Sequence, residues 1–581
     1  MIKQLLSCVR EYKREAILTP VFVSLEVLFE CLIPFIIANL VNEIQAGCGL
    51  ETIVKNGAVL IVLAVLSLVC GLLSGAVCAT ASAGFAKNLR HDLFYKVQEF
   101  SFENIDRFET SSLVTRLTTD VTNIQNAFMM LIRVGIRTPL MMIFACTMAV
   151  IMGGRLALVF VFVIPVLFVG LLIIGLRVLP LFRRVFRKYD AINESIQENI
   201  HGMRVVKSFV REQHETEKFT RASDDVRRDF TRAEKILALN SPLMQFCMYT
   251  VMIFVMTMGP YMIITSNGLD INVGELSSML SYNYQVLSSL MTLAMIVVMM
   301  TMAVESARRA CEILSEESTL KNPENPVFEV KDGSIDFDDV SFRYAKTAKR
   351  DTLSDVNLHI KSGETIGIIG GTGSSKSTLV QLVCRLYDVT EGTLRVGGVD
   401  VRDYDLDTLR NSVAVVLQKN VLFSGTIRDN MRWGDKNATD EEIIHALELA
   451  NAMEFVSQMP DGLDTHIEQG GANVSGGQKQ RLCIARALLK KPKILILDDS
   501  TSAVDTHTDA MIRKSFSEYI PETTKLIIAQ RISSVQDSDR IIILDGGRID
   551  DVGTHDELLE RSKIYSEVFY SQTRSGDFDA Q

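Results

Sequence analysis

Apolar and polar positions follow two different patterns along the chain. Before residue 305, six apolar runs are each long enough to cross the hydrocarbon core of a bilayer, which takes about 20 residues. They predict membrane-spanning helices at 17–41, 54–79, 134–152, 156–176, 243–264 and 276–304. From Phe328 onward, short β-branched runs alternate with amphipathic helical patterns, which predicts an α/β layer fold.

These two patterns define the predicted domain organisation. Residues 1–314 form an all-α transmembrane domain with six spans and two long cytosolic loops, and residues 328–570 form an α/β domain. Residues 315–327 are polar and contain Pro323 and Pro326, so they are predicted to be a linker. Residues 571–581 are predicted to be a disordered tail. The predicted fold class is multidomain, a six-helix membrane part followed by an α/β part.

The loops between the spans predict the orientation of the chain in a lipid bilayer. Loops after the first, third and fifth spans are short, whereas those after the second and fourth are long and rich in Lys and Arg. Because cytosolic loops carry an excess of basic residues, both long loops and both termini are predicted to be cytosolic. The N-terminal stretch lacks a short apolar core with a cleavage site, so no cleaved signal peptide is predicted. We expect a multi-pass protein of the plasma membrane.

Charge and cysteine content narrow the class of protein further. The chain has 60 basic and 70 acidic residues, a formal net charge of −10, so its charge gives no support to a nucleic-acid partner. Its 10 cysteines are scattered, several of them inside the apolar runs, without a C-x-x-C pair. A disulfide framework and a zinc site are therefore not expected.

Polar and flexible residues inside the predicted spans leave alternatives open. Glu26 and Glu30 lie one helical turn apart and share a face; they either contact a cationic substrate or form an interhelical polar pair. Methionines gather in the last two spans, where they either shape an adaptable binding surface or simply pack. Gly71 and Gly75 form G-x-x-x-G, which favours close helix packing.

The stretch IGIIGGTGSSKSTLVQL, 366–382, predicts a phosphate-binding loop. A buried strand ends in glycines and opens into a helix, and Gly370, Lys376 and Ser377 match G-x-x-x-x-G-K-[ST]. Ser375 stands where the second glycine belongs. Backbone N–H groups at a helix start suit an anionic phosphate chain, with Lys376 on the outer phosphates and the Ser377 hydroxyl on Mg²⁺. The predicted loop residues are Gly370, Gly371, Thr372, Gly373, Ser374, Ser375, Lys376, Ser377 and Thr378.

A second stretch, NVSGGQKQR, lies upstream of a buried strand, 494–497, that ends in Asp498 and Asp499. A phosphate loop, an SGGQ segment and an acidic strand end, in this order, resemble the nucleotide-binding domain of ABC transporters. With the six spans ahead of it, the chain resembles an exporter-type half-transporter, in which a membrane domain is fused to an ATPase domain. The resemblance implies ATP and Mg²⁺ as cofactors.

The resemblance also assigns roles to individual residues. Tyr344 would stack on adenine, Gln418 would contact Mg²⁺ and relay the nucleotide state, and Asp498 would position Mg²⁺. The signature segment would reach across a dimer to the partner's ATP, and Asp505 would lie in a loop that crosses the interface. The signature residues are Ser475, Gly476, Gly477 and Gln478. The long loops resemble the intracellular loops of ABC exporters, which points to Phe108 and residues 199–202 as contacts with nucleotide-binding domains.

Two catalytic positions depart from the family pattern. Asp499 stands where glutamate is expected, and Gln530 stands where a histidine is expected. The shorter side chain withdraws the carboxylate by roughly an ångström, a displacement that can cost on the order of 10²-fold in rate. Glutamine can bind a γ-phosphate but cannot take up a proton as histidine does. Both replacements together predict a degenerate site that binds ATP and turns it over slowly.

An intact signature beside a degenerate catalytic pair implies an unlike partner. The expected assembly resembles the heterodimeric multidrug-type ABC exporters of bacteria, with a second, non-identical half-transporter that supplies the glutamate and the histidine. Such proteins move drugs, lipids or peptides, and the sequence does not choose among these substrates. Two alternatives remain, a homodimeric exporter with two weak ATP sites and a nucleotide-binding membrane regulator that transports nothing.

Overall fold

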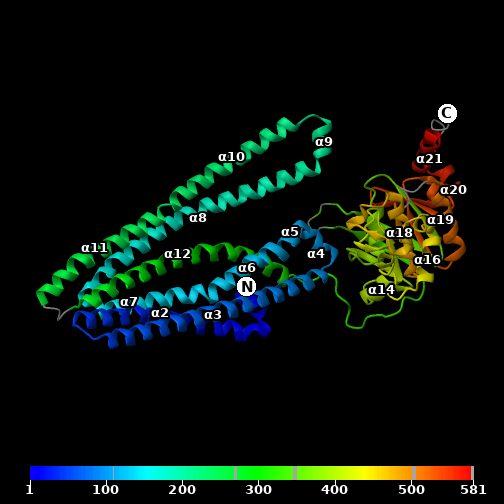
Figure 1. Cartoon of the computed structure of the whole chain (residues 1–581). Helices are drawn as coiled ribbons and strands as arrows, with labels where there is room; N and C mark the ends of the chain where they lie inside the picture. Colours follow the sequence, from blue (N-terminus) through cyan, green and yellow to red (C-terminus); the bar gives the residue numbers. More distant parts are fainter. Residues whose placement is uncertain (109, 267–270, 345–347, 349, 500–505, 577–581) are drawn as a thin grey trace. The chain divides into compact units, whose positions relative to one another are not determined.

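The computed structural model describes residues 1–108, 110–266, 271–344, 348, 350–499 and 506–576. The chain divides into two compact units (Figure 1). The first comprises Met1–Glu99 and Glu109–Glu316, and the second comprises Phe100–Phe108 and Glu317–Gln581. A short segment of the first long loop therefore belongs with the C-terminal half of the chain.

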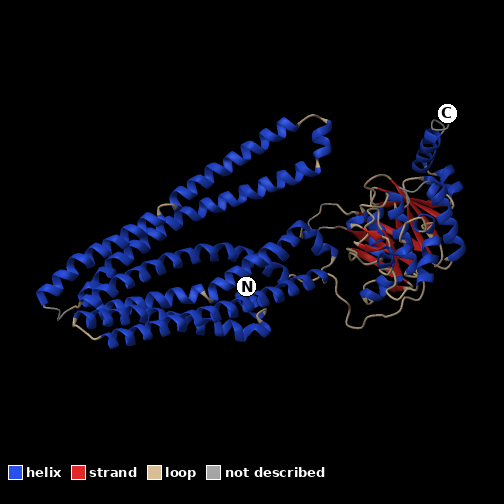
Figure 2. Ribbon diagram, in the orientation of Figure 1, coloured by secondary structure: helices blue, strands red, loops and turns tan. Residues whose placement is uncertain are grey.

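The first unit is helical throughout its described residues (Figure 2). Its elements are α1 (Ile2–Ser7), η1 (Arg10–Tyr12), α2 (Lys13–Gln45), α3 (Leu50–Gln98), α5 (Thr110–Thr115), the π-helical turn η2 (Arg116–Asp120), α6 (Val121–Ile132), α7 (Val134–Gly153), η3 (Gly154–Ala157), α8 (Leu158–His201), α9 (Met203–Ser208), α10 (Glu212–Leu237), α11 (Asn240–Ser266) and α12 (Val273–Ser315). Helices α8 and α10 run side by side and α9 joins them (Figure 1).

Five continuous helical runs in the described residues are long and apolar enough to cross a membrane. One of them, 110–200, contains both α7 and α8, which the 3-10 turn η3 separates. Gly154 begins this turn with a φ of 46°, a left-handed backbone conformation that glycine adopts without strain. Each of the six predicted segments therefore lies on a helix of its own, apart from residues 156–157, which belong to η3, and several of these helices extend well beyond the apolar run.

The charged groups among the spans pair with one another across helices. Arg137 of α7 donates from Nη2 to Glu30 Oε2 over 2.6 Å, and its Nε lies 3.5 Å from Glu26 Oε1. A Cβ at Gly71 would lie 3.4 Å from the Glu26 carboxyl group, and one at Gly75 would lie 3.6 Å from the guanidinium of Arg133. The two glycines thus leave room for charged side chains, and the glutamates adopt the interhelical alternative.

Two ion pairs join the turn η2 to the C-terminal end of α12. Arg309 donates from Nε to Asp120 Oδ2 over 2.7 Å, and the Asp120 side chain is fully buried. Arg116 donates from Nη1 to Glu312 Oε2 over 2.9 Å and to the Arg309 carbonyl over 3.1 Å. Buried carboxylates require such partners, because an unpaired buried charge is strongly destabilising.

The second unit contains three sheets among its described residues. An antiparallel sheet has the order β2-β1-β4-β5, a larger sheet has the order β12-β11-β3-β10-β9-β6, and β7 pairs with β8. The strands are β1 (Ile335–Phe342), β2 (Leu353–Ile360), β3 (Thr365–Gly370), β4 (Glu391–Val396), β5 (Val399–Asp400), β6 (Val413–Val416), β7 (Gly425–Thr426), β8 (His466–Ile467), β9 (Ile494–Asp498), β10 (Thr524–Ile528), β11 (Arg540–Asp545) and β12 (Arg548–Gly553).

Helices and short 3-10 turns surround these sheets. They are α4 (Phe102–Arg107), α13 (Lys376–Val383), α14 (Leu406–Ser412), α15 (Ile427–Met431), α16 (Asp440–Leu449), α17 (Met453–Val456), η4 (Gly462–Asp464), η5 (Gln469–Gly471), α18 (Gly476–Leu489), α19 (Thr506–Tyr519), η6 (Ile532–Ser534), α20 (His555–Arg561) and α21 (Lys563–Gly576). Helix α21 occupies residues 571–576 of the segment for which the sequence predicted a disordered tail, because it packs against the unit through η6. Residues 577–581 lie outside the described part.

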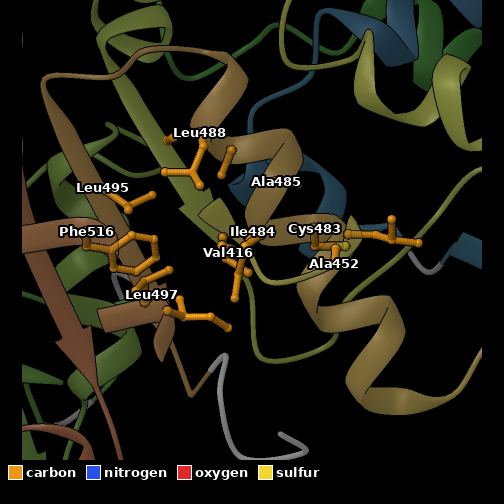
Figure 3. Packing of buried hydrophobic residues seen from close by; sticks show 14 of the residues in the cluster. Val416, Ala452, Cys483, Ile484, Ala485, Leu488, Leu495, Leu497 and Phe516 are labelled. Atoms are coloured by element: carbon orange, nitrogen blue, oxygen red, sulfur yellow. The ribbon is translucent and has the colours of Figure 1, made fainter. Parts of the chain in front are cut away.

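The parallel strands of the large sheet are buried on both faces, which is why they read as continuous apolar runs rather than alternating ones. Figure 3 shows Ile484 and Leu488 of α18 in the core with Leu495 and Leu497 of β9 and Phe516 of α19. Strands β3, β10 and β9 are neighbours and run parallel. Their carboxyl ends, where the predicted site residues follow, therefore lie on one edge of the sheet.

Candidate nucleotide-binding site

The predicted phosphate loop connects β3 to α13. It leaves the strand at Gly370, where a Cβ would collide with the Leu544 carbonyl of β11. Gly371, Thr372, Gly373 and Ser374 form the turn, and Ser375 caps α13 with a φ of 72°. Ser375 therefore has the positive φ that glycine adopts freely, a conformation that costs a non-glycine residue roughly 1–2 kcal/mol.

Lys376 curls back over this loop. Its ammonium group donates to the carbonyls of Gly370 and Gly371, each over 2.9 Å. Burial lowers the pKa of Lys376. The arrangement gathers a cation and the N–H groups of a helix start around one concave turn, which is the chemistry that a polyphosphate requires.

Ser377 and Asp498 form the part of the site that fits a hard cation. The Ser377 hydroxyl donates to Asp498 Oδ1 over 3.0 Å, joining α13 to the end of β9. Burial raises the pKa of Asp498. Hydroxyl and carboxylate oxygens are ligands that Mg²⁺ accepts, so the donor set fits the predicted ion. The third predicted ligand, Gln418, donates from Nε2 to the neighbouring Asp499.

The two residues that depart from the family pattern, Asp499 and Gln530, contact each other directly. Asp499 Oδ2 accepts hydrogen bonds from Gln530 Nε2 over 2.8 Å and from Gln418 Nε2 over 3.2 Å. The backbone of Asp499 is left-handed, with a φ of 47°, a conformation in which aspartate is commoner than most residues. One carboxylate oxygen is thus held by two amide donors, and neither amide can take up a proton at neutral pH.

Tyr344, predicted to stack on adenine, stands beside the phosphate-loop helix. Its hydroxyl lies 3.0 Å from Thr378 Oγ1, and 43% of the residue is exposed. The ring packs edge-on against Tyr387, with 5.1 Å between centroids. An exposed aromatic ring anchored to the phosphate-binding helix is well placed to cover a base.

Tyr387 and helix α4 were not found by sequence reasoning. Tyr387 donates from its hydroxyl to Asp106 Oδ2 of α4 over 2.6 Å, and its ring lies 6.2 Å from that of Phe102. Burial, and then Asp106, raise the pKa of Tyr387. Phe108 follows α4, is buried and stacks on Phe100, and it is grouped with the second unit; its role as a coupling contact stays a prediction. Nothing in the sequence pattern links Asp106 to Tyr387, because 281 positions separate them.

The signature segment starts helix α18. Ser475 is the N-cap: its hydroxyl accepts from the Gln478 N–H over 3.2 Å, while Gln478 Oε1 accepts from the Ser475 N–H over 2.9 Å. Gly476 and Gly477 form the first turn. Helix α18 packs on β6, α15 and α16, whereas α13 packs on β3, β4 and β10. The starts of α13 and α18 are thus carried by different elements, and Asp505 lies outside the described residues.

Comparison with known proteins agrees with this geometry. The family model described as the ABC transporter transmembrane region matches residues 17–303, and the one described as ABC transporter matches residues 353–502. The chain resembles the solved structure of a bacterial Atm1-family ABC exporter with ATP bound, with a TM-score of 0.82, 24% identity and coverage of 97% of this chain and 98% of that one. The fold is therefore that of an exporter-type half-transporter, and the predicted fold class is confirmed.

Relatives by sequence lead to the same family. YfiB of Bacillus subtilis is 34% identical over 571 residues, which are 98% of each chain. Rv1273c of Mycobacterium tuberculosis is 34% identical over 572 residues, 98% of this chain and 97% of that one. Both are named uncharacterized ABC transporter ATP-binding proteins. The chain belongs to the ABC transporter family, as a membrane domain fused to an ATPase domain.

Proposed function

We propose that this chain is the degenerate-site subunit of a heterodimeric ATP-driven exporter. The observation that carries the proposal is the Asp499 carboxylate, held at one oxygen by the amides of Gln418 and Gln530. A general base must reach the attacking water and take its proton. A short side chain with two amide neighbours is poorly suited to that task, although the phosphate loop ahead of it is complete enough to bind ATP.

The chain's own residues divide the work at this site. Lys376 and the N–H groups of the loop would hold the phosphates and Tyr344 would cover the base. Ser377, Asp498 and Gln418 would hold Mg²⁺, which would supply positive charge against the phosphates. Asp499 orients water weakly, and Gln530 offers an amide donor to the γ-phosphate. The site retains ATP longer than it hydrolyses it.

In the proposed dimer, the signature segment of this chain completes the ATP site of the partner. Ser475, Gly476, Gly477 and Gln478 keep the expected sequence, and the capping pair of Ser475 with Gln478 presents an ordered helix start to a phosphate. In the proposed dimer this start faces the ATP of the second half-transporter, whose glutamate and histidine perform hydrolysis. Asp505 is proposed to lie in the loop beside it.

Exposed apolar surfaces support assembly with such a partner. On the second unit, Phe423 and Trp433 stack with centroids 4.2 Å apart although both are exposed. On the first unit, Phe209 and Val210, beyond residues 199–202, are 72% and 81% exposed. Exposed apolar patches of this kind mark interaction sites, and we assign both to contacts between the two half-transporters.

The transported substrate is proposed to be apolar or amphipathic, a drug, lipid or peptide. Met252, Met256 and Met295 are exposed on the helices of the first unit, and flexible thioethers adapt to ligands of different shape. Because Arg137 already pairs with Glu30, the glutamates give no preference for cationic compounds. We place the chain in the bacterial plasma membrane with both termini cytosolic.

The test compares the two ATP sites in the purified complex with the partner. Gln478→Ala should lower ATP hydrolysis more than about tenfold, because it removes the group that completes the competent site, whereas Asp499→Asn should lower it less than about twofold. Ser517→Ala, at an exposed position of α19, is the control. Equal losses from both changes would contradict the asymmetry.

Two further outcomes identify the alternatives. If the chain is purified alone as a homodimer and hydrolyses ATP rapidly, the protein is the homodimeric exporter. Nucleotide binding without substrate movement in sealed vesicles that contain both subunits indicates the membrane regulator.

A further inference from the structure

The C-terminal helix α21 lies directly against the loop that carries Gln530. It packs on η6, which follows that loop, and it buries Tyr565 completely. Ile564, Val568 and Phe569 pack against the apolar cluster that includes strands β9 and β10. The first half of the helix, up to Phe569, is therefore packed on the unit, and Gln572 in the exposed second half reaches the loop that carries Gln530.

Gln572 extends this docking to the backbone of the loop. Its Oε1 accepts a hydrogen bond from the Ile532 N–H over 2.9 Å, and its Nε2 donates to the Gln530 carbonyl over 2.8 Å. One side-chain amide thus bridges the two peptide groups that flank Arg531. The side chain of Gln530, on the same short loop, donates to Asp499 Oδ2 over 2.8 Å.

We propose that Gln572 is a positioning residue of the ATP site, which holds the backbone at Gln530 so that the Gln530 amide stays on Asp499. The loop between β10 and η6 has irregular backbone, and ordering such residues costs conformational entropy that fixed hydrogen bonds offset. A side-chain amide that satisfies both a donor and an acceptor of the backbone restricts the position of the loop, and with it the Gln530 amide, which is proposed to serve the γ-phosphate.

The helix gives this contact a regulatory consequence. Terminal helices open locally at lower free energy than the core, so undocking α21 would release the loop while the phosphate loop stays intact. ATP retention at this chain's site would then follow the docking of the C-terminal helix. The inference rests on the proposed role of Gln530 in the ATP site and is independent of whether the partner is identical.

The test measures release of a fluorescent ATP analogue, MANT-ATP with Mg²⁺, from the full chain in lipid nanodiscs. Gln572→Ala should speed release about fivefold, which corresponds to roughly 1 kcal/mol, with an unchanged thermal midpoint. Glu567→Gln is the matched control, because Glu567 lies on the same helix with an exposed side chain and should leave release unchanged. Gln572→Glu keeps the acceptor for Ile532 but loses the donor for Gln530, and it should give a smaller acceleration.

A double-mutant comparison separates positioning from mere packing of the helix. If Gln572 acts through Gln530, Gln572→Ala should add nothing to release in a Gln530→Ala background. The same acceleration in both backgrounds, or unchanged release in Gln572→Ala and Gln572→Glu, overturns the proposal. The asymmetry of hydrolysis between Gln478→Ala and Asp499→Asn tests the proposed function separately, so the two can fail independently.

Discussion

At the scale of single residues, the chemistry of the ATP site depends on the length of one side chain. Asp499 replaces the longer glutamate and occupies a left-handed backbone position, with a φ of 47°. Its carboxylate is directed to two glutamine amides. Asp499 therefore contributes charge and hydrogen bonding to the site. To act as a general base, its carboxylate would have to reach a water molecule instead of the two amides.

Restoring the family residues should restore hydrolysis. Since Gln478 is proposed to serve the partner's ATP, Gln478→Ala silences the competent site and leaves this chain's site to be measured. In that background, Asp499→Glu with Gln530→His should raise ATP hydrolysis on the order of 10²-fold. Asp499→Asn with Gln530→His is the control, and a similar rise in the control would contradict the assignment of Asp499.

The phosphate loop offers a matched pair of backbone substitutions. Ser375 has a φ of 72° and Gly373 a φ of 81°, and glycine adopts both without strain. Ser375→Gly should therefore raise the free energy of unfolding by about 1 kcal/mol, and Gly373→Ala should lower it by a similar amount. Among the described atoms, a Cβ at Gly373 would meet none within 4 Å, so its effect is purely conformational. Denaturant unfolding of the ATPase half measures both changes. If the two substitutions shifted the free energy of unfolding in the same direction, this account would be contradicted.

At the scale of elements, helix α3 provides an anchor for the N-terminal segment. Arg10 donates to Asp92 over 2.8 Å, Asn88 Nδ2 donates to the Cys8 carbonyl over 3.0 Å, and the ring of Tyr12 lies on Gly84. A Cβ at Gly84 would collide with that ring. The absence of a side chain at this position is what lets η1 approach α3.

Two glycines of the same helix should therefore respond oppositely to alanine. Gly84→Ala should lower the thermal stability of the chain in detergent by about 1–3 kcal/mol, because overpacking forces the neighbouring ring to move. Gly57→Ala should leave stability unchanged or raise it by up to about 1 kcal/mol, since no described atom lies within 4 Å of the added Cβ. A loss at Gly57 as large as that at Gly84 would contradict the packing argument.

Local patterns predicted the elements well and the long-range contacts poorly. The lengths of the apolar runs identified α2, α3, α7, α8, α11 and α12, and the motif order located β3, α13, α18 and β9. The pairing of Glu30 with Arg137 and the contact of Gln572 with the Gln530 loop leave no periodic signal, since they depend on tertiary packing. Asp499 and Gln530 could be recognised as departures only because the neighbouring motifs showed which residue the family has at each position.

At the scale of the whole molecule, helix α4 belongs to the ATPase unit although the chain reaches it from α3. Asp106 accepts from Tyr387, and Asn104 Nδ2 donates to the Glu317 carbonyl over 3.1 Å. Tyr387 in turn contacts Tyr344. Tyr344, proposed to cover the base, is therefore linked to α4 through Tyr387.

Removal of one hydroxyl group should loosen this attachment. Tyr387→Phe keeps the ring contacts but loses the hydrogen bond to Asp106, so hydrogen–deuterium exchange of the α4 amides should rise about three- to tenfold, the effect of losing roughly 1 kcal/mol. Tyr519→Phe, an exposed ring elsewhere on the unit, is the control. Unchanged exchange in α4 would show that ring packing alone holds the helix.

The ion pairs between η2 and α12 determine at which residue the chain can be truncated to give a stable membrane half. A shortened polypeptide that stops before Arg309 would leave the buried carboxylate of Asp120 without this ion-pair partner, a defect worth about 3–5 kcal/mol. One that stops at Ser315, the last residue of α12, keeps both pairs. Size-exclusion profiles in detergent should show a single sharp species for the longer fragment and aggregation for the shorter. The boundary of the stable membrane half therefore lies after the end of α12 and not at the bilayer surface.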